Sequence, residues 1–193
     1  MKLRLFALSA LLTSSVLSAS PLAAGYVYGS DHCYGFEAPA GWRMDNRLLA
    51  RHGVGMAFLP LQEGVLPGVL LYTRSAARTD GMSSEEAIKN QVNDVLAMYA
   101  ADGTRIRAER LRTVAARNGV RGELWRFYGH ANGREERAVY FPAERTVNFF
   151  VAQIPDSKWT ADAEAALIKL AVSYHERASC RPCQVEGSCV PVK

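Results

Sequence analysis

The fold is decided by residues 123–154, which read ELWRFYGHANGREERAVYFPAERTVNFFVAQI. Two turn signals divide this stretch into three short runs that are rich in aromatic and β-branched residues, a composition typical of strands. The first signal, Asn132-Gly133, is a strong indicator of a two-residue hairpin turn, in which both central residues have a positive φ. The second signal is Glu144-Arg145. The stretch therefore predicts three antiparallel strands joined by two hairpins.

The two turns also set the register of the strands. The first turn pairs Trp125 with Tyr140, and the second places Tyr140 opposite Phe149. Since side chains alternate between the faces of a strand, the stretch has two faces. One face is apolar and is predicted to form a core: Trp125, Phe127, Ala138, Tyr140, Val147, Phe149 and Val151. The other face is mixed: Leu124, Arg126, Tyr128, Arg137, Val139, Phe141, Asn148 and Phe150.

The mixed face is the candidate binding surface. Arg126, Tyr128, Arg137 and Phe150 are its arginine and aromatic side chains, the residue types that are enriched among the energetically dominant residues of protein interfaces. The alternative is that a helix or loop covers part of this face, with arginine stems lying over apolar neighbours. On the first interpretation, these four residues contact a protein partner.

Further strands are predicted on both sides of this stretch, at residues 33–36, 55–59, 68–73 and 105–111. Glycine and proline turn signals separate the earlier ones. No internal repeat and no linker indicates a second domain.

Two helices are predicted. The first begins after Ser83, which forms an S-x-x-E capping box with Glu86, and it ends at Asp102-Gly103. The second begins near Trp159 and runs to about His175 with an apolar stripe on one face. Two helices and an antiparallel sheet predict an α+β fold, most simply an α/β/α sandwich with the sheet flanked by helices.

The first 25 residues predict export. Two basic residues precede an apolar run, and small residues follow it near Ala24 and Gly25, as in a secretory signal peptide that is cleaved close to these positions. The run is too short for a comfortable membrane span, and no second candidate span follows. We expect a protein of the periplasm or the extracellular medium, without stable membrane insertion.

Composition and charge narrow the class of protein. The chain has 193 residues, 49% hydrophobic and 22% charged, which is ordinary for a folded protein. Its formal net charge of +4 falls when the basic residues of the leader are removed, and the remainder is too small to indicate a nucleic-acid partner. We expect one domain, residues 26–177, between the leader (1–25) and a cysteine-containing tail (178–193).

Four cysteines follow the leader: Cys33, Cys180, Cys183 and Cys189. An even number in an exported chain predicts two disulfides, with three possible pairings. We favour Cys33 with Cys180 and Cys183 with Cys189, because a bridge from the start of the domain to its tail closes a long loop. The alternatives are a C-x-x-C redox pair, or a zinc site completed by Cys33 or His175. Export disfavours free thiolates, so we expect disulfides and neither a metal nor a cofactor.

Catalytic motifs are not evident. The four histidines, His32, His52, His130 and His175, are scattered, and none has the spacing of a zinc protease. No G-x-S-x-G segment supplies a nucleophile. The sequence therefore does not predict an enzyme.

The segment FEAPAGW, residues 36–42, resembles the F-x-x-P-x-G-W start of Mog1/PsbP-like and DcrB-like bacterial domains. The order of elements agrees, and GREERAVYF, residues 133–141, is similar to the strand that precedes the final strand and helix of that family. The resemblance covers residues 33–175. It implies a compact sandwich, usually without catalysis, that serves as a binding or assembly module. Exported members include immunity proteins that neutralise secreted toxins.

These observations lead to two functional expectations. The first is a non-catalytic periplasmic domain that binds a protein partner, in an immunity or envelope-accessory role. The alternative is a carrier of a small amphiphile or lipid, with a pocket between the final helix and the sheet.

Overall fold

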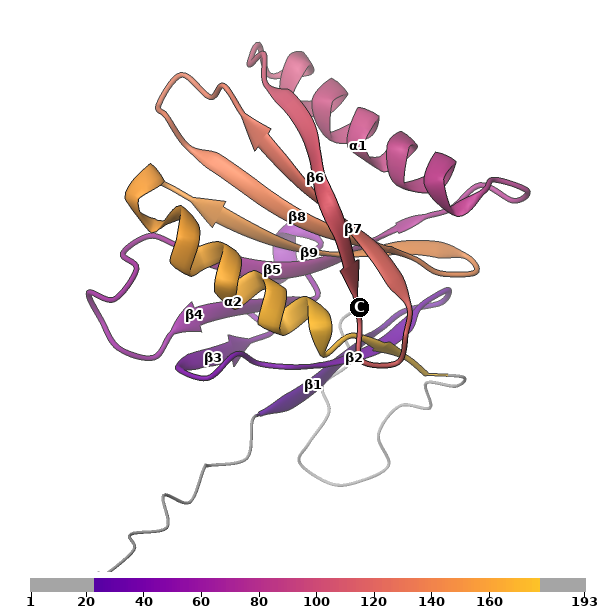
Figure 1. Ribbon diagram of the computed structural model, residues 1–193, viewed down its shortest axis with the longest axis horizontal. Helices are drawn as coiled ribbons and strands as arrows, with labels where there is room; N and C mark the ends of the chain where they lie inside the picture. Colours follow the sequence, from indigo (N-terminus) through magenta and orange to yellow (C-terminus); the bar gives the residue numbers. More distant parts are fainter. Residues whose placement is uncertain (1–22, 178–193) are drawn as a thin grey trace, which may run out of the picture.

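The computed structural model describes residues 23–177, which form two antiparallel sheets and two α-helices (Figure 1). The large sheet has the strand order β3 (Trp42–Asp45), β4 (Met56–Pro60), β5 (Leu70–Ala77), β9 (Thr146–Ile154), β8 (Glu135–Pro142), β7 (Arg121–Tyr128) and β6 (Arg107–Ala115). The small sheet has the order β1 (Ala24–Tyr28), β2 (Cys33–Glu37) and β10 (His175–Glu176).

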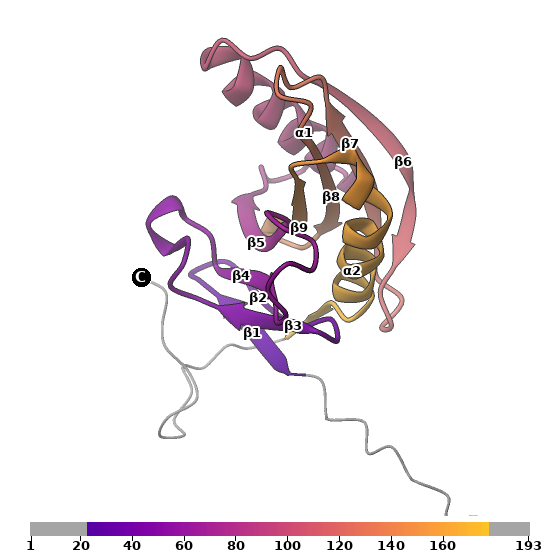
Figure 2. The same cartoon turned by 90° about the vertical axis from the view of Figure 1, so that its left-hand side faces the viewer.

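The helices α1 (Ser84–Ala101) and α2 (Thr160–Val172) cover opposite faces of the large sheet. α1 follows β5 and crosses one face to reach β6 at the sheet edge, and β6 to β9 then return as a meander until β9 pairs with β5. α2 follows β9, after a short 3-10 turn, on the other face, and Figure 2 shows the strands between the two helices. The predicted α+β sandwich is confirmed. Among residues 23–177, neither helix has the length and apolar character needed to cross a membrane.

The hairpin between β7 and β8 is wider than predicted. Trp125 pairs with Ala138 instead of Tyr140. A two-residue turn needs a positive φ at both Asn132 and Gly133, but of these two only Gly133 has one, at 73°. The Gly133 N–H donates to the carbonyl three residues earlier, at 2.9 Å. The predicted register was wrong by two residues, which leaves every side chain on its predicted face because the faces alternate with period two.

The hairpin between β8 and β9 has the predicted register. Tyr140 lies opposite Phe149, and Val139 lies opposite Phe150. The predicted core face is also confirmed, because its sheet residues pack against Ile88 of α1 in one cluster: Phe127, Ala138, Tyr140, Val147, Phe149 and Val151, with Trp125 partly buried.

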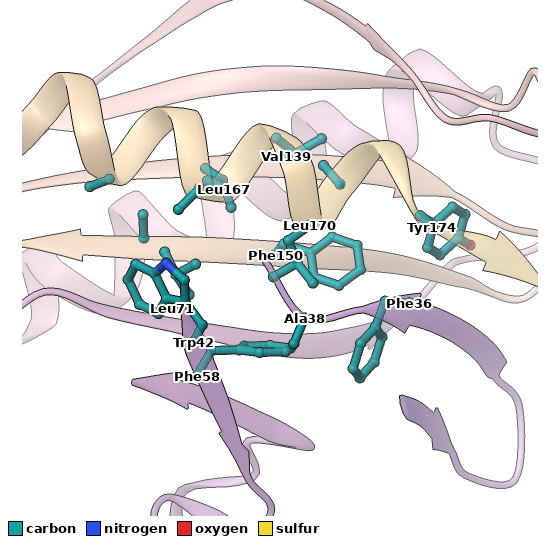
Figure 3. Close-up of a cluster of buried hydrophobic side chains, with 14 of the residues drawn as sticks. Phe36, Ala38, Trp42, Phe58, Leu71, Val139, Phe150, Leu167, Leu170 and Tyr174 are labelled. Carbon is teal, nitrogen blue, oxygen red and sulfur yellow. The ribbon is translucent and has the colours of Figure 1, made fainter. Parts of the chain in front are cut away.

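The larger core lies on the other face, between α2 and the large sheet (Figure 3). Leu167 and Leu170 of α2 are fully buried against Phe150 of β9. Phe36 of β2, in the small sheet, and Trp42 at the start of β3, in the large sheet, contribute rings to the same cluster. The face that is mixed in sequence is therefore mostly core.

α2 ends at Val172, earlier than predicted. The Ser173 hydroxyl donates to a carbonyl of the last helical turn at 2.6 Å and accepts the Glu37 N–H at 2.8 Å. The chain then becomes extended and pairs Glu176 with Tyr34 of β2. This pairing with a strand near the start of the domain is a long-range effect, and the helical pattern around His175 does not reveal it.

The N-terminus of α1 has the predicted capping box. Ser83 Oγ accepts the Glu86 N–H at 3.2 Å, and the Glu86 carboxylate accepts the Ser83 N–H at 2.9 Å. We expect Ser83→Ala to lower the free energy of unfolding by about 1 kcal/mol, because it leaves one amide of the first turn without a partner. Urea denaturation measures the change. Ser84→Ala, at the exposed first residue of the helix, is the control, and an equal loss in both variants would contradict the role of the cap.

Candidate functional site

A cavity of about 190 Å³ lies between α1 and the large sheet. Ala138, in the middle of β8, is at its floor and pairs with Trp125 on one side and Val151 on the other. The neighbours of Ala138 on the same face of β8 are Glu136 and Tyr140, so that a small side chain stands between two large ones. The lining is Tyr72, Arg74, Ser75 and Ala76 of β5, Gln91, Asp94, Val95, Met98 and Tyr99 of α1, and Phe127, Glu136, Ala138, Tyr140, Phe149 and Val151 of β7 to β9.

The roof of the cavity is the C-terminal half of α1, which is less buried than the N-terminal half. Ile88 and Val92 are buried, whereas Tyr99 is half-buried and Met98 is 49% exposed. Asp94 lines the cavity and is also exposed. The cavity therefore opens to solvent along this part of the helix.

One end of the cavity holds a buried carboxylate. Glu136 is 4% exposed, and its Oε1 accepts the Tyr99 hydroxyl at 2.7 Å and the Gln153 amide at 3.4 Å. Arg134 Nη2 lies 3.4 Å from the same oxygen and donates to the Tyr99 hydroxyl oxygen at 3.0 Å. These partners offset the cost of burying the charge and connect α1 to β8 and β9.

Three tyrosines surround the buried carboxylate. Burial raises the pKa of Tyr72 and of Tyr140, and the negative charge of Glu136 adds to the effect in both. Burial also raises the pKa of Tyr99, reinforced by its hydrogen bond to Glu136. Within the described part of the chain, no hydrogen bond reaches the hydroxyl groups of Tyr72 and Tyr140. Because their pKa values are raised, both hydroxyl groups are neutral at physiological pH. Because no described residue is bonded to them, they are available to a ligand.

His130 closes the outer side of this group. Its ring meets Tyr99 edge-on, with the centroids 4.9 Å apart. Burial lowers the pKa of His130, and the nearby Arg134 lowers it further. The imidazole is therefore uncharged near neutral pH and packs against the Tyr99 ring.

Of the four residues that the sequence predicts as a binding surface, Phe150 and Arg137 are buried. Phe150 is 0% exposed and belongs to the larger core, so its side chain cannot contact a partner. Arg137 is 5% exposed, and it pairs with Glu135 at 2.8 Å and with Glu164 of α2 at 3.3 Å. The prediction is wrong for Phe150 because α2 covers this part of the face.

Arg126 and Tyr128 are half-buried at the border of the same face. The Arg126 guanidinium lies 4.6 Å from the Tyr128 ring centroid and pairs with Glu135. Arg112 of β6 reaches Glu164 at 3.2 Å and extends the same ion-pair network. Contact of Arg126 and Tyr128 with a partner stays a prediction, and the network accounts for the arginines through structure alone.

The predicted disulfides involve residues outside the described ranges. Cys33 begins β2, whereas Cys180, Cys183 and Cys189 follow the last described residue, Arg177. Both pairings therefore stay predictions. Within the described part of the chain, no group of three or more His, Cys, Asp or Glu side chains is placed to hold a metal ion.

A second hollow, of about 320 Å³, lies between the β1–β2 turn and the β8–β9 turn. It is bordered by Asp31 and Arg145, exposed side chains whose charged atoms are 3.9 Å apart. Arg177 also borders it, and the chain continues from there into residues outside the described range. The cavity beneath α1 is smaller than this hollow but more enclosed.

The pocket of the predicted amphiphile carrier is not between the final helix and the sheet. The space between the final helix and the sheet holds the larger core, and the cavity lies under the first helix. Glu136, Tyr99 and Tyr72 line this cavity but are not among the site residues that the sequence predicts. The available signal was the small Ala138 in a strand of large residues.

Comparisons with known proteins bear on the fold. No protein-family model matches the sequence, and no curated protein matches it. Among solved structures, the chain is similar to cyanobacterial PsbP (CyanoP) from Synechocystis sp. PCC 6803, with a TM-score of 0.54 and 15% identity over 86% of this chain and 99% of that one. A protein from Bacteroides thetaiotaomicron matches with a TM-score of 0.44 and 10% identity, over 82% of this chain and 47% of that one. The expected resemblance is confirmed at the level of architecture: this chain has the PsbP-like α+β fold.

Proposed function

We propose that this protein is a non-catalytic binding domain of the periplasm that holds a small ligand with an apolar body in the cavity beneath α1. The observation that carries the proposal is the cavity itself. It combines apolar walls, from Phe127, Phe149 and Val151, with a few convergent polar groups at one end. Small-molecule sites in proteins have this combination, in which polar groups orient a ligand held by apolar contact.

The chemistry of the polar groups supports binding rather than catalysis. Burial raises the pKa of Tyr72, Tyr99 and Tyr140, which makes a nucleophilic or basic tyrosinate unfavourable at neutral pH. Glu136 already has Tyr99, Gln153 and Arg134 as partners on one oxygen. The fold of the domain is compatible with this role.

Filling the cavity tests the proposal. Ala138→Leu places a larger side chain on the cavity floor, and we expect it to abolish ligand retention while the melting temperature stays unchanged or rises. Native mass spectrometry of the purified protein reports the retained ligand. Ala115→Leu, at an exposed position of β6, is the matched control and should retain it. Equal ligand occupancy in the two variants, or no ligand on the wild-type protein, would count against the proposal.

Export of the domain is supported by the leader-like residues 1–25. Ala24 of β1 pairs with Glu37 of β2, and the carbonyl of Ala23 accepts the Ala38 N–H at 2.8 Å. Cleavage near Ala24 or Gly25 therefore leaves a mature chain that starts at or within β1. N-terminal sequencing of the protein from periplasmic extract tests both the location and the cleavage point.

A protein partner is the second candidate, in an immunity or envelope-accessory role. The observation that favours it is a group of exposed apolar side chains near β3 and β4: Leu48 (49%), Leu61 (63%) and Val65 (46%) are exposed. Leu48 and Val65 line a shallow groove of about 310 Å³. A partner that binds here should be retained by the wild-type protein and by Ala138→Leu, but lost by Leu61→Asp with Val65→Asp. Retention by the aspartate variant would exclude this surface.

A further inference from the structure

We propose that the ligand of the cavity beneath α1 is a small organic cation: an ammonium group joined to an aromatic or branched aliphatic body. This inference rests on the proposed binding function and assigns the chemical class of its ligand. It follows from the free oxygen of Glu136, the rings around it and the size of the space.

The free oxygen of Glu136 is the first argument. Oε1 takes all three partners of the carboxylate, namely Tyr99, Gln153 and Arg134. No hydrogen bond from the described residues reaches Oε2, and this atom is not among the fully enclosed unpaired atoms. Because the side chain is almost wholly enclosed and lines the cavity, we infer that the accessible side of Oε2 faces the cavity. A carboxylate oxygen that has no protein partner in a largely enclosed site favours a ligand that donates hydrogen bonds and carries positive charge.

The aromatic rings are the second argument. Tyr72, Tyr99 and Tyr140 all line the same cavity as Glu136. The faces of such rings attract organic cations, and cages of aromatic side chains are a known means of holding ammonium groups. The hydroxyl groups of Tyr72 and Tyr140 stay neutral because burial raises the pKa of both, so they add hydrogen-bonding capacity and no further charge.

The charges of the cavity lining are mixed, with two acidic side chains and one basic side chain. Arg134 is engaged with Oε1 and with the Tyr99 hydroxyl, and it is not part of the lining. The charged side chains of the lining are Glu136, Asp94 and Arg74, of which Asp94 is exposed. An anionic ligand that entered the cavity would meet the buried charge of Glu136, which makes its binding unfavourable.

The volume limits the ligand. The cavity of about 190 Å³ is somewhat larger than an engineered apolar cavity of roughly 150 Å³ that binds benzene. A single aromatic ring with a one-carbon ammonium arm is therefore a suitable probe. The ring is expected to lie over Ala138 between Phe149 and Val95, with the ammonium group at Glu136.

The test compares three probes of nearly equal shape: benzylammonium, benzyl alcohol and benzoate. Isothermal titration of the purified protein at pH 7 should show benzylammonium binding at least ten-fold more tightly than benzyl alcohol, and no binding of benzoate. Glu136→Gln should remove the ten-fold preference and leave binding of benzyl alcohol. Asp80→Asn, which removes an exposed carboxylate outside the cavity lining, should keep the preference.

The outcomes separate this inference from the proposed function. Equal affinity of the wild-type protein for benzylammonium and benzyl alcohol would overturn the cation assignment and leave the binding function in place. A preference lost in Asp80→Asn, or kept in Glu136→Gln, would overturn the role of Glu136. Binding of none of the three probes by the wild-type protein would overturn the inference together with the binding function. The comparison on the wild-type protein does not depend on the folding of any variant.

Discussion

Replacing Phe150 by alanine is expected to lower the free energy of unfolding by about 3–5 kcal/mol. The side chain is 0% exposed. Its ring lies edge-on to those of Tyr34, Phe36, Phe141 and Tyr174, with centroids between 5.9 and 6.3 Å apart. Truncation removes the buried area and leaves a cavity. The neighbouring rings are held by β2, β8 and the segment after α2, so they can fill this cavity only in part. Equilibrium unfolding in urea measures the loss.

The control for this variant is Leu111→Ala. Leu111 is 39% exposed on the edge strand β6, where a bulge interrupts the pairing between Arg110 and Arg112. Its truncation should change the free energy of unfolding by no more than about 0.5 kcal/mol. A loss below about 1 kcal/mol for Phe150→Ala would contradict its place in the core. Loss of partner binding with an unchanged unfolding curve would restore Phe150 to the binding surface that the sequence predicts.

Phe150 also shows which part of the fold is readable from sequence. Alternation along β7 to β9 predicts two faces, and the structure keeps every residue on its predicted face. What covers a face depends on contacts far apart in the chain. Arg137 suggests a solvent-facing position, but Glu164 of α2 and Glu135 neutralise it in a nearly buried position. No local pattern in residues 123–154 indicates that Glu164 of α2 will pair with Arg137.

The wider first hairpin has a local cause that the turn rule does not capture. Asn132-Gly133 is compatible with a two-residue turn, but Gly129 also has a positive φ, at 95°. With left-handed glycines on both sides, the chain makes a longer connection in which Asn132 keeps a negative φ. Both glycines are visible in the sequence, but which turn forms depends on the free energy of strand pairing along the whole of β7 and β8, and a local turn rule does not include this contribution.

The candidate site was less predictable than the fold. Glu136 follows Glu135 in β8, and because side chains alternate along a strand, the two point to opposite faces: Glu135 pairs with Arg137, while Glu136 meets Tyr99. The burial of Glu136 depends on Tyr99, which reaches it from another element, α1. Helical spacing correctly places Tyr99 on the inner face of α1, but it cannot say that the helix leaves space above Ala138.

Cys33→Ser is expected to lower the melting temperature under oxidising conditions, by the equivalent of about 2–4 kcal/mol. The Arg177 N–H donates to the Cys33 carbonyl at 3.1 Å, so the chain returns to Cys33 three residues before Cys180. Three residues span at most about 10 Å, and the Cα atoms of a disulfide lie roughly 4.4–6.8 Å apart, so Cys180 can reach Cys33. A bridge between them closes a loop of about 150 residues, which restricts the unfolded chain strongly in the chain-entropy account.

Matched variants identify the partner of Cys33. Cys180→Ser should lower the melting temperature as much as Cys33→Ser, and the double variant should lower it no further, because both substitutions remove the same bridge. Cys183→Ser should cost less, since its predicted bridge to Cys189 closes a far shorter loop. With reductant present, wild-type protein and Cys33→Ser should melt together. If Cys183→Ser instead reproduces the effect of Cys33→Ser while Cys180→Ser does not, the bridge is real and its predicted partner is wrong. Identical melting of the wild-type protein and Cys33→Ser under oxidising conditions would mean that Cys33 contributes no stabilising bridge, because a closed loop of this length cannot be lost without consequence for the unfolded chain.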